Sequence, residues 1–214
     1  MSVQSTTTIL YIRHAETPNN ATKMRRGEKT NEPLSDIGML QAATLAYHFA
    51  RKYPDTSMMY TSPKLRTIQT ATEISTTLFG KVDLKEDQRL IEVVSGLQED
   101  TSYEEAARIS EDYNRLIVDT YSDPNDRPQF PGGESNNQAI ERMEAFALEI
   151  AETHPGEKIA TVTHAHALDL FLKNLFPEAP RLKNCDVIEL FCDPSSEDNA
   201  FTLGEHRKFS DWKV

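Results

Sequence analysis

The 214-residue sequence has little cysteine, no long apolar run and no excess of positive charge. Only Cys185 and Cys192 are present, which excludes a disulfide scaffold, and their spacing is not that of a C-x-x-C redox or zinc motif. No apolar stretch approaches the roughly 18 residues of a membrane span. With 23 Lys and Arg against 34 Asp and Glu, the net charge of −11 argues against a general binder of nucleic acid or of an anionic membrane.

The remaining composition is that of one globular domain. Hydrophobic residues make up 38% and charged residues 27% of the chain, as in folded soluble proteins. The length suits a single domain over 1–214. The N-terminal segment lacks the basic region and the apolar core of a signal peptide, which predicts a cytoplasmic protein.

Alternating apolar and amphipathic segments predict an α/β fold. Strands are expected at 8–13, 57–61 and 158–163, and helices at 35–52, 62–80, 102–121, 135–153 and 167–176. The segment 82–94 is expected to be extended, and 187–192 and 200–203 are expected as edge strands. This order predicts a three-layer α/β/α sandwich with a mostly parallel central sheet.

A few polar residues stand at predicted strand ends or helix starts. Arg13 and His14 follow the first strand, His164 follows the strand at 158–163, and Arg66 lies in the first turn of a helix. Taken singly, each is typical of a hydrogen-bonded structural residue or a surface ion pair. Ligands of α/β sheets collect at the carboxyl ends of strands, so the two histidines meet if their strands are neighbours. Together they suit phosphoryl transfer: arginines hold the oxygens, a neutral His14 attacks, and Glu92 acts as the general acid.

Six stretches of the chain form an ordered series of motifs. They are Arg13-His14-Ala15-Glu16-Thr17, Pro33-Leu34-Ser35-Asp36-Ile37-Gly38, Ser62-Pro63-Lys64-Leu65-Arg66-Thr67-Ile68-Gln69-Thr70-Ala71, Leu90-Ile91-Glu92 followed three residues later by Gly96, Pro131-Gly132-Gly133-Glu134-Ser135 and Val162-Thr163-His164-Ala165. In content and order the series resembles the signature motifs of the histidine phosphatase superfamily, the clan that includes the cofactor-dependent phosphoglycerate mutases. The resemblance implies a phosphoglycerate mutase-like fold over the predicted domain.

The resemblance also implies a phosphohistidine mechanism that uses no metal and no cofactor. In that mechanism His14 attacks the phosphoryl group, while Arg13, Arg66 and His164 hold its oxygens. Glu92 protonates the leaving alcohol and later helps water to release phosphate. The resemblance makes Asn20 a further donor to the phosphate. The residues expected around the substrate are Asn20, Thr17, Arg26, Gly27 and Ala165.

Two departures from the family pattern bear on activity. Ala15 and Ala165 stand where glycine is usual, and a Cβ there is expected to narrow the approach to phosphate or to conflict with a positive φ. They are the sequence features that favour an alternative, a phospho-ligand-binding member of the fold with weakened catalysis. His166 is an extra histidine beside His164. A metal pair is one interpretation, but no carboxylate or cysteine stands at a ligand spacing, which favours a residue at the pocket rim.

The segment Glu92-Val93-Val94-Ser95-Gly96 lacks the arginine and tyrosine that the mutases carry after the catalytic acid, and the chain is short. Both features favour a phosphatase over a mutase. Val93 and Val94 suit packing of the loop, or else a less polar substrate. The expected substrate is a small-molecule phosphate ester, such as a sugar phosphate or a nucleotide, and a phosphoprotein is a weaker alternative. A cluster of basic residues either recognises a second phosphate or forms a solvated loop: Lys23, Arg25, Arg26 and Lys29. The natural substrate and the oligomeric state are left open.

Overall fold

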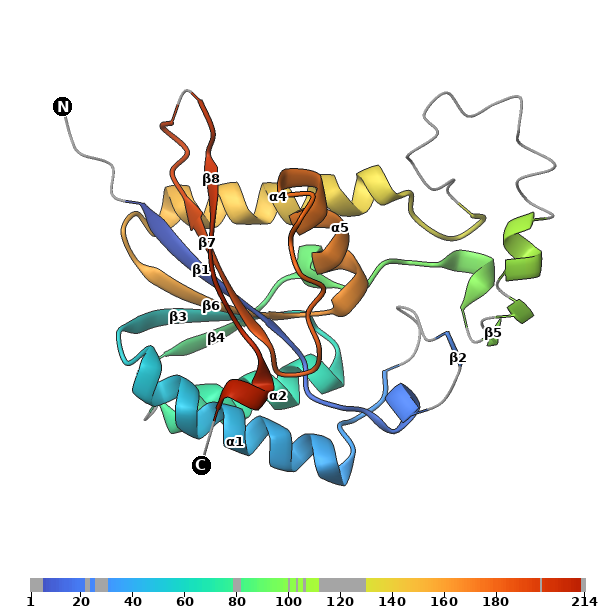
Figure 1. The fold of residues 1–214 in the computed structure, drawn as a ribbon, viewed down its shortest axis with the longest axis horizontal. Helices are drawn as coiled ribbons and strands as arrows, with labels where there is room; N and C mark the ends of the chain where they lie inside the picture. Colours follow the sequence, from blue (N-terminus) through green and yellow to red (C-terminus); the bar gives the residue numbers. More distant parts are fainter. Residues whose placement is uncertain are drawn as a thin grey trace.

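The computed structural model describes residues 6–21, 24–25, 31–78, 82–99, 101–102, 104–105, 107–111, 130–196 and 198–212. Its centre is a six-stranded sheet with helices on both faces (Figure 1). The strands are β1 (Thr7–Arg13), β3 (Thr56–Thr61), β4 (Asp83–Glu86), β6 (Lys158–Thr163), β7 (Val187–Cys192) and β8 (Phe201–Arg207). The helices are α1 (Asp36–Lys52), α2 (Leu65–Thr77), α4 (Asn136–Thr153) and α5 (Ala165–Leu175).

The sheet is mixed, with strand order β4-β3-β6-β1-β7-β8. Strands β4, β3, β6 and β1 run parallel, whereas β7 and β8 are antiparallel to their neighbours. The register of β1 and β6 pairs Arg13 with Thr163, so the residues that follow both strands emerge side by side. A small antiparallel sheet of β2 (Met24–Arg25) and β5 (Thr101–Ser102) lies beyond these carboxyl ends in Figure 1.

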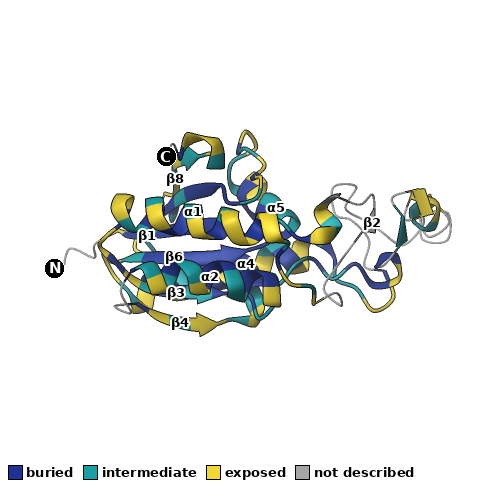
Figure 2. Ribbon diagram, turned by 90° about the horizontal axis from the view of Figure 1, so that it is seen from below, coloured by how far each residue is buried: buried dark blue, intermediate teal, exposed yellow. Residues whose placement is uncertain are grey.

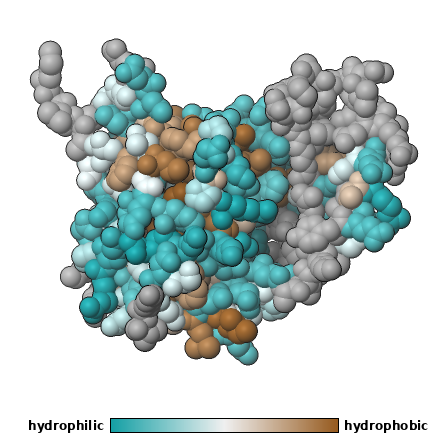
Figure 3. Space-filling view, viewed as in Figure 1, coloured by the Kyte–Doolittle hydropathy of each residue, from teal (hydrophilic) through white to brown (hydrophobic). Residues whose placement is uncertain are grey.

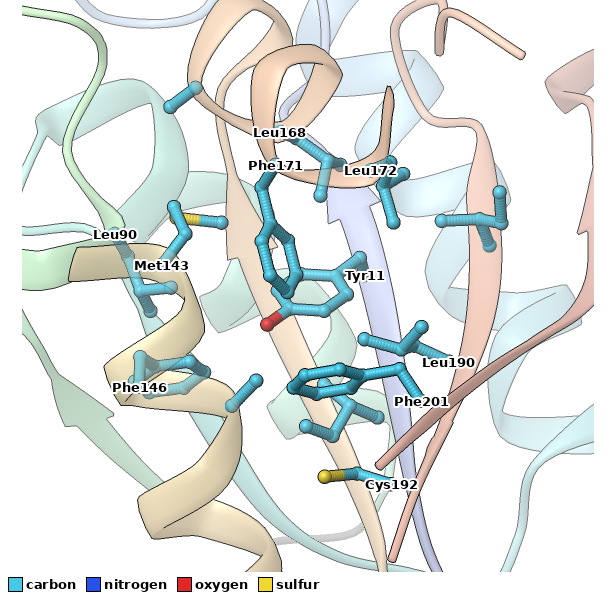
Figure 4. Packing of buried hydrophobic residues seen from close by; sticks show 14 of the residues in the cluster. Tyr11, Leu90, Met143, Phe146, Leu168, Phe171, Leu172, Leu190, Cys192 and Phe201 are labelled. Atoms are coloured by element: carbon cyan, nitrogen blue, oxygen red, sulfur yellow. The ribbon is translucent and has the colours of Figure 1, made fainter. Parts of the chain in front are cut away.

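Side chains that alternate along β1 build the core on both sides of the sheet. Tyr11 packs with α4 and α5, and Figure 4 shows its ring beside that of Phe171, which in turn contacts the ring of Phe201. Leu10 and Ile12 face the other way and pack with α1 and α2. Because a strand sends successive side chains to opposite faces, its continuous apolar run requires cover on both. The predicted three-layer α/β/α architecture is confirmed, and the buried central strands contrast with the exposed outer faces of α1 and α2 in Figure 2.

Two helix starts follow directly from serine caps. Ser35 Oγ accepts a hydrogen bond of 2.9 Å from Gly38 N at the start of α1. Ser135 and Gln138 form a capping box at the start of α4, each side chain accepting from the backbone of the other. These side chains satisfy amide groups that the first helical turn leaves unpaired, which is why both helices begin where the sequence predicts.

Some predicted boundaries differ from the structure. The α2 helix begins at Leu65 rather than 62, because Ser62 N still bonds Val162 O at the sheet. The α5 helix begins at Ala165 rather than 167, with His164 as its N-cap. Within the segment expected to be extended, β4 is followed by a 3₁₀ turn at Gln88–Leu90.

The prediction of two late edge strands is wrong for β7, which pairs with β1 on one side and β8 on the other. Strand β8 is the edge, and it extends to Arg207 rather than 203. Strand periodicity cannot separate an inner from an outer strand when the sheet order depends on distant pairing. Of the helix expected at 102–121, residues 104–105 and 107–111 are helical, Ser102 instead belongs to β5, and the remaining positions lie outside the described residues.

The face of the molecule in Figure 3 is largely hydrophilic, as the high charge content leads one to expect. Apolar residues gather across the upper part of this view and at its lower edge over the first half of α1, whose exposed apolar residues include Ile37 and Leu40. None of the described helices combines the length and the apolar composition that a bilayer crossing requires.

Candidate active site

His14 is the first residue after β1 and is buried at the carboxyl end of the sheet. Its backbone N–H donates to Thr163 O at 3.1 Å, which continues the β1–β6 ladder beyond the strand. The ring Nδ1 lies 2.7 Å from Ala15 O. Because a carbonyl oxygen only accepts, Nδ1 carries the proton and Nε2 keeps its lone pair. The side chain is therefore oriented as a neutral imidazole with Nε2 as its nucleophilic atom.

His164 follows β6 and lies beside His14, with ring centroids 5.3 Å apart. Arg66 Nη2, from the first turn of α2, lies 3.1 Å from His164 Nδ1. A guanidinium only donates, so His164 Nδ1 accepts and Nε2–H donates to Ser62 Oγ at 2.8 Å. The fold thus brings together both histidines and Arg66. Ser62 was not singled out as a site residue, although it stands in the S-P-x-x-R motif.

The electrostatics of this cluster keep both imidazoles neutral. The pKa of His14 lies well below its ordinary value of 6.5, because of burial first and then the charges of Arg66 and Arg13. Burial and the charge of Arg66 also lower the pKa of His164. The fixed positive charge therefore resides on the guanidinium groups, which suits an anionic ligand next to a neutral nucleophile.

The loop at 182–186, which leads into β7, forms hydrogen bonds with the residues at the carboxyl end of β1. Arg13 Nη1 donates to Leu182 O at 3.0 Å, and Cys185 N donates to Arg13 O at 3.0 Å. Asn184 Nδ2 donates to His14 O at 2.9 Å. Cys185 has a φ of 63°, a conformation uncommon for a residue other than glycine. No motif in the sequence indicates this contact, because its donors and acceptors are mostly backbone groups.

Glu92 reaches the same end of the sheet from the segment after the 3₁₀ turn. Its Oε1 accepts hydrogen bonds of 2.9 Å from Val93 N and from Ala167 N. Its Oε2 accepts one of 3.2 Å from His166 N. Two of these donors belong to the first turn of α5, whose N-cap is His164. A helix N-terminus attracts negative charge, so α5 holds the carboxyl group close to the second histidine.

The predicted substrate-contacting residues have different surroundings. Thr17 is buried, and its Oγ1 has no hydrogen-bond partner among the described residues. Asn20 Oδ1 accepts from Thr17 N at 3.0 Å and from Asn184 Nδ2 at 3.2 Å. Ala165 is the first residue of α5. The predictions for Arg26 and Gly27, and for the side chains of Lys23, Arg25 and Lys29, lie outside the described residues.

Neither alanine in the glycine positions meets the predicted backbone conflict. Among the described residues, Cys185 is the non-glycine residue with a positive φ, so Ala15 and Ala165 need no glycine conformation. Ala15 is fully buried in the core on the α1 and α2 side, and its N–H donates to Thr70 Oγ1 at 3.1 Å. The expectation that a Cβ conflicts with a positive φ at these positions is wrong. Val93 is also buried in the core, in agreement with packing of the loop.

The interpretation of His164 and His166 as a metal pair requires further ligands beside them. Within the part of the chain that the structure describes, no group of three or more His, Cys, Asp or Glu side chains is placed to hold a metal ion.

Comparison with known proteins identifies relatives of the whole fold. The family model of the histidine phosphatase superfamily (branch 1) matches residues 9–195. Phosphoglycerate mutase-like protein 4 of Arabidopsis thaliana is 29% identical over 175 residues, which cover 82% of this chain and 74% of that protein. The metal-independent phosphoserine phosphatase of Arabidopsis thaliana is 30% identical over 167 residues, 76% of this chain and 66% of that protein.

Solved structures show the same architecture at lower identity. A phosphoserine phosphatase mutant from Entamoeba histolytica in complex with phosphoserine has a TM-score of 0.77 at 18% identity, covering 96% of this chain and 98% of that one. A phosphoglycerate mutase from Bacillus anthracis has a TM-score of 0.73 at 19% identity, covering 98% and 96%. These likenesses show the fold, and the family match agrees with the ordered motifs. The chain belongs to the histidine phosphatase superfamily, branch 1.

Proposed function

We propose that the chain is a metal-independent phosphoric monoester hydrolase whose nucleophile is Nε2 of His14. The observation that carries this proposal is the tautomer of that ring: Nδ1 is tied to Ala15 O, which leaves the lone pair on Nε2. The cationic Arg66 and the partner His164 lie at the same buried site. The match to the superfamily supports this function, as does the name of the metal-independent phosphoserine phosphatase relative.

In the first step the His14 Nε2–P bond forms and the P–O bond to the leaving alcohol breaks. Arg13 and Arg66 hold the phosphoryl oxygens and stabilise their charge, and His164 joins them by turning its Nε2–H from Ser62 Oγ to the substrate. Glu92, in its acid form, gives a proton to the leaving oxygen. Its Oε2 accepts one backbone hydrogen bond against two for Oε1, so Oε2 is the atom with room for that proton.

In the second step water attacks phosphorus and the P–N bond to His14 breaks. The Glu92 carboxylate now takes a proton from the water, which restores the acid form for the next turnover. Inorganic phosphate then leaves between the two histidines. Because the His14 imidazole is neutral, Nε2 attacks phosphorus without first losing a proton. The ring also leaves phosphorus in the second step as a neutral imidazole, without gaining one.

The proposed substrate is a small-molecule phosphate ester. Thr17, the Asn20 amide nitrogen and Ala165 are the described residues that we place next to it. The structural relatives from Entamoeba histolytica are complexes with phosphoserine and with 3-phosphoglyceric acid, which makes these esters the first candidates to assay. The missing arginine and tyrosine after Glu92 favour hydrolysis over mutase activity. A cytoplasmic location remains a prediction from the N-terminal segment, and the lack of nucleic-acid or membrane partners remains one from the net charge and the lack of a long apolar run.

The test is phosphate release from p-nitrophenyl phosphate with EDTA present. We expect activity to survive the chelator and to fall by at least about 1,000-fold in His14→Ala, because removal of a nucleophile costs at least that much. Rapid quenching should trap an acid-labile, base-stable phosphoprotein in the parent and none in the variant. His48→Ala is the matched control, since His48 lies on α1 and stacks on Trp212.

Four outcomes would contradict the proposal. Loss of activity in EDTA would show a metal-dependent reaction. Activity retained in His14→Ala would show that His14 is not the nucleophile. Conversion of 3-phosphoglycerate to 2-phosphoglycerate without phosphate release would assign the site to the mutases. A folded parent that binds phosphate esters and turns none over would support the phospho-ligand-binding alternative.

A further inference from the structure

The backbone just before Glu92 is held by a side chain from another layer of the fold. Arg142, on α4, donates from Nη1 to Arg89 O at 2.6 Å and to Ile91 O at 2.9 Å. Ile91 is the residue that precedes Glu92. One guanidinium nitrogen therefore anchors two carbonyl groups of the segment that carries the proposed acid.

The backbone just after Glu92 is held by the partner of that arginine. Glu134 Oε1 accepts a hydrogen bond of 2.9 Å from Val94 N, and Glu134 N donates to Val94 O at 2.9 Å. The same carboxylate binds Arg142 through two bonds, Nε to Oε2 at 3.0 Å and Nη2 to Oε1 at 2.7 Å. Both side chains are largely buried, at 15% and 14% exposure. The ion pair thus spans both sides of Glu92.

The turn before Glu134 allows the backbone of Glu134 to approach the backbone of Val94 closely. A Cβ on Gly133 would lie 2.8 Å from Val94 O, a distance that real Cβ atoms do not adopt. Gly133 also forms an antiparallel bridge with Ser95. The glycine in the P-G-G-E-S motif therefore allows the backbone of Glu134 to pair with Val94, which places the carboxylate next to the Arg142 fork.

The side chain of Glu92 is held independently by the first turn of α5. Its neighbour Val93 is buried in the core. With the backbone tied to α4 and the carboxyl group tied to α5, the position of the acid is determined from both sides. Arg142 also lies near enough to His164 for its charge to contribute to the lowered pKa of that ring.

We propose that Arg142 and Glu134 are positioning residues that hold the Glu92 carboxyl group at the leaving oxygen of the substrate. This inference rests on the proposed function, in which Glu92 is the acid. Replacing a buried ion pair with apolar residues often leaves the free energy of unfolding unchanged. A contribution to stability therefore does not by itself account for this pair. Its distinguishing feature is that both partners also bind backbone groups that flank the acid. Arginine suits the task because its planar fork serves a carboxylate and two carbonyls together.

The experiment compares two phosphate esters whose leaving groups differ in their need for a proton. Nitrophenolate leaves p-nitrophenyl phosphate with little protonation, whereas the alkoxide of β-glycerophosphate requires an acid. The readout is kcat/KM, which includes P–O cleavage. In Arg142→Gln we expect a loss of about 10- to 100-fold for the alkyl ester and less than about threefold for the aryl ester. Arg142→Lys should lose less.

The matched control is Arg89→Gln, on the same segment as Glu92, which removes contacts to Asp87 and to Glu149 of α4 and leaves Arg142 and Glu134 in place. We expect it to change both esters equally and by less than about threefold. Glu134→Gln is the second positioning variant, since it keeps an acceptor for Val94 N if Arg142→Gln fails to fold. Circular dichroism and thermal unfolding confirm that each variant is folded.

Glu92→Gln separates failure of this inference from failure of the proposed function. It should show the same preference for the aryl ester, and adding Arg142→Gln to it should cost little more, because coupled residues are not additive. Equal losses for both esters in Glu92→Gln would refute the acid role and the positioning role together. A leaving-group effect in Glu92→Gln, with equal losses for the two esters in Arg142→Gln and Glu134→Gln, would refute the positioning role alone.

Discussion

We expect the free energy of unfolding to fall below about pH 6.5, because two buried histidines are neutral in the folded chain. Burial and the charge of Arg66 hold the pKa of His14 and of His164 well below 6.5. Below that value the unfolded chain binds protons that the folded chain does not, so acid favours unfolding. Above it neither state binds these protons and the effect disappears.

The expected size follows from proton linkage. A histidine that has its ordinary pKa of about 6.5 in the unfolded chain, and that the folded chain keeps neutral, costs up to about 1.4 kcal/mol between about pH 7.5 and 5.5. His14 and His164 together therefore cost up to about 2.7 kcal/mol over that range. His14→Asn removes one titrating group and leaves the carboxylates unchanged. The parent should lose up to about 1.4 kcal/mol more than the variant on acidification.

The measurement is urea unfolding followed by circular dichroism at several pH values across this range. Buffers must contain no phosphate, because a bound anion would stabilise the folded state and mask the effect. Parallel pH profiles for the parent and His14→Asn would refute the reasoning. They would mean that the folded chain takes up the proton on His14 as readily as the unfolded chain does.

Further predictions concern packing, a buried hydrogen bond and a helix cap. Gly38→Ala should destabilise the fold by about 1–3 kcal/mol despite the helix preference of alanine, because its Cβ would lie 2.0 Å from Glu16 O; a raised midpoint in urea would contradict the contact. Ser62→Ala should cost about 1–3 kcal/mol, since it leaves His164 Nε2–H buried without its acceptor, and an unchanged thermal midpoint would show that the bond contributes nothing. Ser135→Ala should cost about 1 kcal/mol through loss of the capping box, measured by urea unfolding; retention of full stability would show that other contacts define the helix start.

Local sequence features were sufficient for much of the fold. The apolar run of β1 predicts a buried strand because both of its faces need cover, and Ser35 and Ser135 mark helix starts because their side chains bond amides three residues ahead. The place of β7 inside the sheet was not predictable in this way. It depends on pairing with β1, whose residues are more than 170 positions away in the chain.

Resemblance to the ordered family motifs indicated which residues to examine at the site, but not what holds them. His14, Arg66 and His164 were singled out from their motifs and their places near strand ends and helix starts. The tautomer of His14 required knowledge of its contact with Ala15 O. Glu134 was noted at a helix start, yet its pairing with Arg142 around the proposed acid is visible only in three dimensions.

The sequence by itself determined the chemical types at the site and the segments that carry them, because periodicity, caps and motifs are properties of neighbouring residues. The tertiary structure alone decided the partners. Ser62 meets His164, Asn184 meets His14, and Arg142 meets the backbone beside Glu92 across long stretches of chain. Such contacts depend on how the layers pack, and packing brings together hydrogen-bonding groups whose separation in sequence carries no signal.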